Sequence, residues 1–220
     1  GLDRLAAMGT SFTQGYCADP SCSPARASLL SGRPSNEHGL LLNRREMVPG
    51  IADIGTWMRE QAGYQSWYAG KWHILGRRPH ECFEIINRGT IFGEASDISV
   101  LRSFEGRLSH HDPSSPFFAV VSLLNPHDIA EWVSLEWSDA TASSQDLDIE
   151  ALPELPANFQ TTHRESALHR QIRRRARLRD RWGEDKWRTY LWWYHRMTEM
   201  VDGIVGRLLD LVQNSHYGEN

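Results

Sequence analysis

Cysteine, lysine and long apolar runs are all scarce in this chain of 220 residues. Three cysteines are too few for a disulfide scaffold, and their odd number leaves at least one outside any internal disulfide. No apolar run approaches the roughly 20 residues of a membrane-spanning helix. A formal net charge of -4 gives no reason to expect nucleic acid as a partner. Any specific function must therefore be found in local motifs.

The remaining composition is that of a globular domain, with 40% hydrophobic and 24% charged residues. At this length we expect one domain. The first residues, Gly-Leu-Asp-Arg, lack the basic start and the apolar segment of a signal peptide. Residues 2–8 instead predict an amphipathic helix, so we expect the chain to begin inside a folded domain.

Helical and strand-like patterns alternate along the chain. The expected helices cover residues 2–8, 22–31, about 51–62 and 187–212, and the expected strands cover 65–70 and 116–124. Residues 10–16 read as a short extended segment, 33–50 and 131–162 as loops, and 76–112 as weakly patterned. The arginine-rich residues 163–182 read as a solvated helix face rather than a nucleic-acid site. The continuous apolar run 116–124 suits a strand buried in a parallel sheet, so the fold class is α/β.

One dense site begins at Cys22, in the segment Cys-Ser-Pro-Ala-Arg. Pro24 fits the first turn of a helix, with Cys22 and Ser23 at its start and Ser23 able to accept a bond from a free backbone N–H. Unpaired N–H groups and the helix dipole favour an anion here. Arg26 can share a helix face with Cys22, and Gly32 is a natural stop. The pattern indicates a nucleophile facing a sulfate or phosphate group, the alternative being a structural cysteine.

Two further segments carry polar residues suited to an anion. Residues 63–73 end in Gly-Lys-Trp-His, and in an extended strand Lys71 and His73 would project to the same side. Together they could bind one anionic group, although alone they could equally be a surface lysine and a histidine with structural partners. His127 follows the strand 116–124, where ligands bind in open α/β sheets.

Taken in order, these segments resemble the signatures of the sulfatases, the formylglycine-dependent family of the alkaline-phosphatase-like superfamily. The matching stretches are Cys-Ser-Pro-Ala-Arg, then Gly-Lys-Trp-His, then Phe-Phe-x-x-x-Ser-x-x-x-Pro-His. The resemblance covers nearly all 220 residues. It implies a three-layer α/β/α sandwich with a mostly parallel sheet, incomplete at both ends. Residues 1–220 would then be part of a single catalytic domain.

The resemblance also implies a mechanism for cleaving a sulfate ester, such as that of a sulfated carbohydrate. Cys22 would be oxidised to formylglycine, whose hydrate attacks sulfur and later expels sulfate. Arg26 would hold the hydrate, Lys71 would contact a sulfate oxygen, and His73 would assist deprotonation. His127 would touch the sulfate or protonate the leaving oxygen. A bound Ca²⁺ ion would polarise the sulfate.

The metal site is where the sequence departs from the family. Sulfatases usually carry an Asp-Asp pair before the first helix and an Asp-Asn or Asp-His pair after the long helix. Asp3, Asp53, Asp112 and Asp128 do not match those positions, and only Cys22 maps to a metal contact. We therefore expect an internal fragment that has little activity in isolation.

The expected partners are a small-molecule or saccharide sulfate ester and a maturing enzyme. That enzyme would be the formylglycine-generating or the anaerobic sulfatase-maturing kind. By resemblance, the compartment would be periplasmic, secreted or lysosomal. Two alternatives stay open: a phosphodiester or phosphonate monoester hydrolase of the same superfamily, and an inactive fragment or non-catalytic binding protein on this fold.

Overall fold

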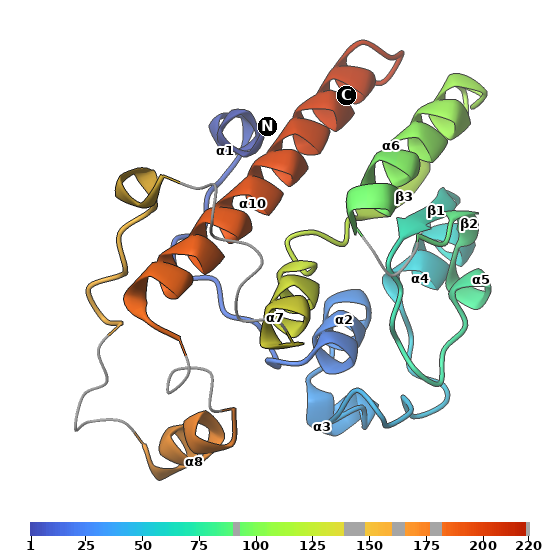
Figure 1. The fold of residues 1–220 in the computed structure, drawn as a ribbon. Helices are drawn as coiled ribbons and strands as arrows, with labels where there is room; N and C mark the ends of the chain where they lie inside the picture. Colours follow the sequence, from blue (N-terminus) through green and yellow to red (C-terminus); the bar gives the residue numbers. More distant parts are fainter. Residues whose placement is uncertain (90–92, 139–147, 160–165, 177–181, 219–220) are drawn as a thin grey trace. The chain divides into compact units, whose positions relative to one another are not determined.

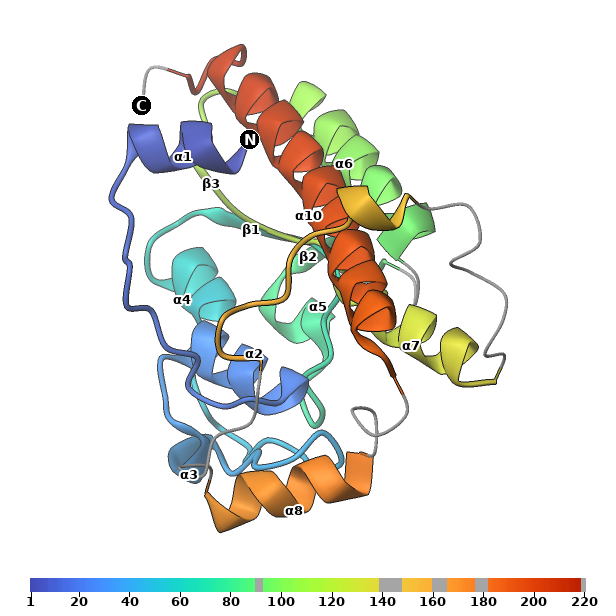
Figure 2. The same ribbon diagram turned by 60° about the vertical axis from the view of Figure 1, so that its left-hand side comes forward.

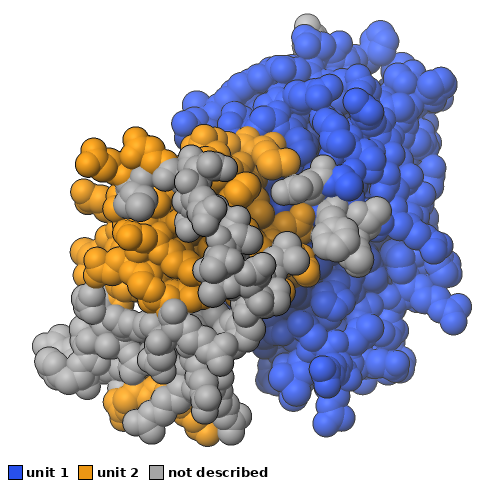
Figure 3. Space-filling model, viewed as in Figure 1, with its two compact units in different colours: residues 1–125, 201–220 blue, residues 126–200 orange. Residues whose placement is uncertain are grey.

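The computed structural model describes residues 1–89, 93–138, 148–159, 166–176 and 182–218. The chain divides into two compact units, which Figure 3 shows in different colours. The first unit contains residues 1–125 and 201–220, and the second contains residues 126–200. Among the described residues, no helix is both long enough and apolar enough to cross a membrane.

The first unit is built on a parallel sheet with strand order β2-β1-β3. The central strand β1 (Gln65–Gly70) pairs with β2 (Glu84–Asn87) on one side and with β3 (Phe117–Ser122) on the other. Gly70 lies opposite Ser122, so β1 and β3 end at the same level. All three strands run in one direction, as predicted, and their carboxyl ends share one edge of the sheet.

Helices cover both faces of this sheet (Figures 1 and 2). On one face lie α2 (Cys22–Ser31) and α4 (Ile54–Glu60), and on the other lie α6 (Gly93–Ser109) and the last part of α10 (Glu184–Gln213). Buried residues of the first face include Ala27, Leu30, Tyr68, Cys82 and Phe83. The second face is packed by Trp67, Phe104 and Leu108, with Leu208 and Leu211 against them. The predicted three-layer α/β/α arrangement is therefore confirmed.

Alternation along β1 explains why both layers are held firmly. Trp67 is fully buried and stacks on Phe117, with ring centroids 4.6 Å apart. Its neighbour Tyr68 is buried toward the opposite face and lies tilted against Phe83. Burying a large apolar side chain contributes about 1.5–3 kcal/mol, so consecutive residues of one strand stabilise both helix layers.

Helix α1 (Leu2–Met8), at the predicted position, is attached to α10 within the same unit (Figure 2). The amino group of Gly1 donates to the Asp202 carboxylate at 2.9 Å, and Arg4 pairs with Asp210 at 2.6 Å. Both contacts lie at the surface, where ion pairs are worth at most about 1 kcal/mol.

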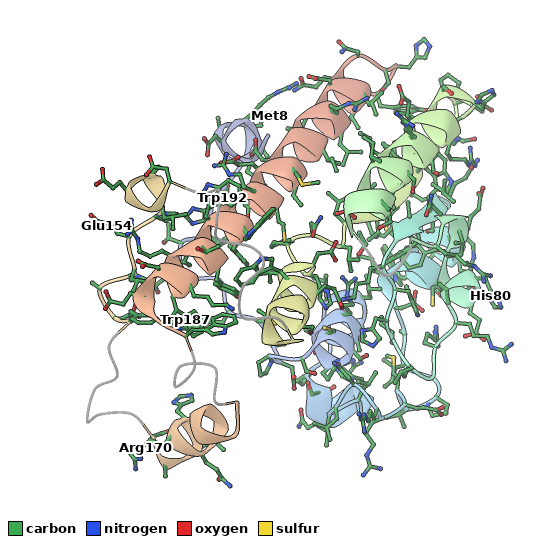
Figure 4. All side chains as sticks on the ribbon, viewed as in Figure 1. Met8, His80, Glu154, Arg170, Trp187 and Trp192 are labelled. Atoms are coloured by element: carbon green, nitrogen blue, oxygen red, sulfur yellow. The ribbon has the colours of Figure 1, made fainter. Side chains whose placement is uncertain are left out.

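The second unit has its own aromatic core on the first half of α10. Figure 4 labels Trp187 and Trp192 on this helix. The second unit also contains α7 (Ile129–Ser138), a 3₁₀ turn (Ile149–Ala151) and α8 (Ala167–Ala176). The buried residues of the core are Ile129, Trp132, Trp182 and Met197, with Val133, Trp187, Tyr190 and Trp193 packed against them. The expected helix within the arginine-rich segment is present, but residues 163–165 and 177–181 lie outside the described residues.

Four expectations about secondary structure need correction. Residues 33–50, expected as a loop, include the short helix α3 (Ser35–His38). Residues 10–16 are exposed and are not extended throughout, because a turn at Thr13 and Gln14 interrupts them. Residues 131–138 continue α7 instead of opening a loop. The weakly patterned stretch 76–112 contains α5 (Pro79–Cys82), β2 and α6. In α6 the buried residues keep a helical spacing, but serines, glycines and charged residues separate them and obscured the pattern.

Candidate active site

Helix α2 begins at Cys22, as predicted, and ends where Gly32 takes a left-handed conformation with φ of 67°. Cys22 is half-buried and in no disulfide. The prediction that Ser23 accepts a capping bond was wrong. Its backbone N–H donates to Asn43 Oδ1 at 2.9 Å, so Asn43 supplies the cap. The buried Ser23 hydroxyl instead donates to the carbonyl of His73 at 2.6 Å.

Arg26 reaches from α2 to the carboxyl ends of two strands. Its Nη1 donates to the Lys71 carbonyl at 2.8 Å and to Ser122 Oγ at 2.9 Å, and it approaches the Tyr68 hydroxyl at 3.5 Å. Ser122 Oγ donates to the same Lys71 carbonyl at 2.9 Å, and so does the Tyr68 hydroxyl. The Lys71 carbonyl oxygen therefore accepts hydrogen bonds from three donors. This network holds α2 against β1 and β3.

The Tyr68 hydroxyl in this network stays protonated. Burial raises the pKa of Tyr68 above its usual 10, although hydrogen bonds with Ser122 and Arg26 and the charge of Arg26 act in the opposite direction. A neutral phenol keeps its proton available for the Lys71 carbonyl.

Gly70 ends the strand and turns the chain into the segment 71–73. Its φ is 105°, and a Cβ atom at this position would lie 1.9 Å from the carbonyl oxygen of Ser122. His73 also has a positive φ of 56°. Lys71 and His73 thus follow the strand and are not part of it. The prediction that Lys71 and His73 project to the same side of an extended strand was therefore wrong.

Four of the five predicted site residues nevertheless come together. Ser23 bonds the backbone of His73, and Arg26 bonds the backbone of Lys71. The first turn of α2, which starts at Cys22, therefore lies along the segment 71–73. Lys71 is half-buried there, while His73 is exposed.

His127 stands at the start of the second unit, where it is exposed. Its carbonyl accepts from the N–H of Ala130 at 3.0 Å, in the turn that leads into α7. Leu124 and Asn125, just before Pro126, belong to the first unit and are fixed by the buried Asp97 on α6. The Asp97 carboxylate accepts from the backbone N–H groups of Leu124 at 2.7 Å and Asn125 at 2.9 Å. The backbone just before Pro-His-Asp is thereby held in place.

Sequence reasoning missed the polar residues that position this site, namely Asn43, Tyr68, Asp97 and Ser122. For Tyr68 and Ser122 a signal existed, because a hydroxyl in a buried strand must find a hydrogen-bond partner. Asn43 and Asp97 come from segments without a clear pattern. Their bonds join residues 20 or more positions apart in the chain.

A partly buried ion pair supports the loop after the segment 71–73. Arg77 pairs with the Asp53 carboxylate, which also accepts from the N–H of Thr56 at 2.8 Å and caps α4. Burial acts to raise the pKa of Asp53, but bonds from Thr56, Cys82 and Arg77 outweigh it and hold the pKa below 3.8. Burial raises the pKa of Cys82 to about 11, despite the nearby Arg77. Cys82 is therefore an unreactive thiol.

The described residues contain no cluster of acidic side chains that could hold a calcium ion. Ca²⁺ takes six to eight oxygen ligands. In the ranges that the structure describes, no group of three or more His, Cys, Asp or Glu side chains lies together to hold a metal ion. Asp53 is engaged with Arg77, and Asp112 with the backbone and hydroxyl of Ser114.

Comparison with known proteins adds to this geometry. A family model described as Sulfatase matches residues 1–220. The chain is 42% identical over 90 residues to the N-acetylgalactosamine-6-sulfatase of Canis lupus familiaris, covering 36% of this chain and 17% of that protein. It is 24% identical over 246 residues to the Delta 4,5-hexuronate-2-O-sulfatase of Bacteroides thetaiotaomicron, covering 100% of this chain and 48% of that protein.

A solved structure described as a putative sulfatase from Bacteroides thetaiotaomicron has the same fold. It superposes with a TM-score of 0.83 at 23% identity, covering 99% of this chain and 50% of that one. The chain thus spans about half the length, or less, of the proteins it matches.

Proposed function

The chain belongs to the sulfatase family, and from this premise we propose that the protein hydrolyses sulfate esters of carbohydrates through a formylglycine made from Cys22. Residues 1–220 are part of its single catalytic domain. The observation that carries the proposal is the contact between the first turn of α2 and the segment 71–73. Two relatives support the choice of sugar sulfates, since their names describe sulfatases of N-acetylgalactosamine 6-sulfate and of a 2-O-sulfated hexuronate.

Arg26 is suited to hold an anion while it also supports the fold. Its hydrogen bonds to the described residues use Nη1 alone. A guanidinium has five N–H donors, so the donors on Nε and Nη2 are left to bind the group at Cys22 and to balance its charge. Its position is fixed, which lowers the entropic cost of orienting it during the reaction.

Lys71, His73 and His127 complete the proposed set. Lys71 supplies a positive charge for a sulfate oxygen, and its backbone is fixed by three donors. His73 is exposed, so its imidazole can exchange protons with solvent and take one from the nucleophile. His127 contacts the sulfate or protonates the leaving alcohol oxygen.

Formylglycine, once hydrated, supplies a hydroxyl nucleophile and a route for releasing sulfate. A formylglycine-generating or anaerobic sulfatase-maturing enzyme would install it on Cys22. Ca²⁺ belongs to the same proposal, with Cys22 in its modified form as one ligand and the other ligands outside the described residues. The periplasm, the exterior of the cell or the lysosome is the proposed compartment.

The test uses the full-length protein that carries this chain, co-expressed with a formylglycine-generating enzyme. Mass spectrometry of the peptide that contains Cys22 should show the aldehyde. The protein should hydrolyse 4-nitrophenyl sulfate much faster than 4-nitrophenyl phosphate. Cys22→Ala should abolish turnover, and Cys17→Ala, at an exposed position outside the site, should leave it unchanged.

Two outcomes would replace the proposal with an alternative. Faster turnover of the phosphate ester or of a phosphonate monoester would identify a phosphoester or phosphonate hydrolase. An unmodified, alkylatable Cys22 thiol together with no turnover of either ester would identify a non-catalytic binding protein on this fold.

A further inference from the structure

A pocket of about 360 Å³ opens beside the segment 71–73, at the carboxyl ends of β1 and β2. Its apolar lining includes Tyr68, Trp72 and Ile85. Helix α5, whose His80 is labelled in Figure 4, forms another part of the lining. Ligand pockets in proteins span about 300–1,000 Å³. This one lies near the lower limit and suits a single sugar ring.

The pocket borders the candidate active site. Gly70 lines it and directly precedes Lys71, while Tyr68 lines it and donates to the Lys71 carbonyl. Trp72 stands between Lys71 and His73 in the chain. Its indole N–H donates to the carbonyl of Arg77 at 2.9 Å, and its ring meets Tyr68 edge-on at 5.0 Å. The indole is therefore held in one orientation before any ligand arrives.

Two exposed arginines, Arg78 and Arg88, give this apolar pocket a positive charge. Neither forms an ion pair with a carboxylate in the described part of the chain. By contrast, Arg33, Arg77 and Arg107 each pair with an acidic side chain. A guanidinium fork matches sulfate or carboxylate oxygens in a bidentate manner. The charge of the pocket is thus complementary to an anion.

We propose that this pocket binds a saccharide unit that carries a negative charge in addition to the sulfate ester being cleaved. The apolar C–H face of the ring lies on Trp72, and its sulfate or carboxylate group pairs with Arg78 and Arg88. The proposal rests on the proposed function and narrows the substrate to a polyanionic sugar. The aromatic face provides apolar contact, and the two arginines provide discrimination against neutral sugars.

Binding can be measured without turnover on the full-length Cys22→Ala protein. Isothermal titration with heparin-derived disaccharides that bear one, two or three sulfate groups should give tighter binding as charge increases. Arg78→Gln and Arg88→Gln should each weaken binding of the trisulfated disaccharide about tenfold or more, because each removes a charge-assisted contact. Both should also flatten the dependence on sulfate number. Arg102→Gln, at an exposed arginine on α6, is the matched control and should change the affinity less than twofold.

The proposal is overturned if both glutamine variants bind the trisulfated disaccharide within twofold of the parent, or if the parent binds none of the disaccharides. Failure of the catalytic proposal looks different. In that case the protein with Cys22 intact hydrolyses no sulfate ester, while binding still depends on Arg78 and Arg88. Since both arginines are exposed, the variants should fold normally, and Arg78→Lys should recover part of the affinity through its retained charge.

Discussion

Ser122→Ala tests whether the hydrogen bonds at the end of β3 hold the active site together. The substitution removes the bond that Ser122 accepts from Arg26 and the bond that it donates to the Lys71 carbonyl, both 2.9 Å long. A bond to a charged group contributes about 1.5–3 kcal/mol and a neutral one about 1 kcal/mol. The Lys71 carbonyl keeps two donors and Arg26 keeps that carbonyl, so neither group is left without a partner.

Because the two lost bonds share partners, and water can reach the half-buried site, their energies will not simply add. We expect the free energy of unfolding to fall by about 2 kcal/mol, which corresponds to roughly 4–8 °C in Tm for a domain of this size. Looser positioning of Lys71 and Arg26 should also lower kcat/KM about tenfold or more.

Thermal unfolding by circular dichroism and steady-state hydrolysis of 4-nitrophenyl sulfate measure the two effects on the full-length protein. Ser109→Ala is the control, because Ser109 is exposed and its hydroxyl bonds only near neighbours at the end of α6. If Ser122→Ala changed neither Tm by more than 1 °C nor kcat/KM by more than twofold, the network would not be what positions Lys71.

Three further predictions concern the surroundings of the site. Asp53→Asn should cost about 2 kcal/mol at pH 7 by weakening the pair with Arg77. The pKa of Asp53 is held below 3.8 in the folded protein, so the parent keeps the whole stability advantage over the variant above that pH. As the pH falls below 3.8 this difference in the free energy of unfolding should shrink, which urea unfolding at a series of acidic pH values measures. Iodoacetamide at pH 8 should leave Cys82 unlabelled until the protein is unfolded, as followed by mass spectrometry, since its thiol is buried with a pKa of about 11. Gly70→Ala should cost more than about 3 kcal/mol, or prevent folding, because the new methyl group would meet the Ser122 carbonyl; a Tm within 2 °C of the parent would show that this turn is not needed.

Residues with strong local preferences made the core of this fold predictable. Pro24 and Gly32 delimit α2, because the fixed φ of proline suits the first turn of a helix and glycine readily takes the left-handed conformation that ends one. The apolar run 116–124 favoured a strand, and β3 lies within it, although its residues are half-buried and not fully buried as expected. The short strand β2 and helix α6 were missed, because four residues or an interrupted apolar stripe carry too little periodicity.

Sequence motifs gave a candidate set of site residues but not their arrangement. Cys22, Arg26, Lys71 and His73 were identified from motif order. What brings four of them together is a set of bonds between side chains and backbone carbonyls distant in sequence, such as Ser23 to His73. Such bonds leave no periodic pattern, so sequence spacing cannot indicate them.

The bonds between distant residues suggest why the motif segments contain residues that take no direct part in the proposed reaction. Ser23 stands beside Cys22 but serves the backbone at His73, a non-glycine residue held at a positive φ. That backbone conformation costs about 1–3 kcal/mol and persists only where the surrounding structure fixes it. Ser122 in the third motif and Tyr68 in the second act in the same way on the Lys71 carbonyl. Each motif therefore supplies at least one residue for the proposed reaction and one residue that fixes the backbone beside a reacting residue. A substitution in one motif should therefore change the position of residues in another.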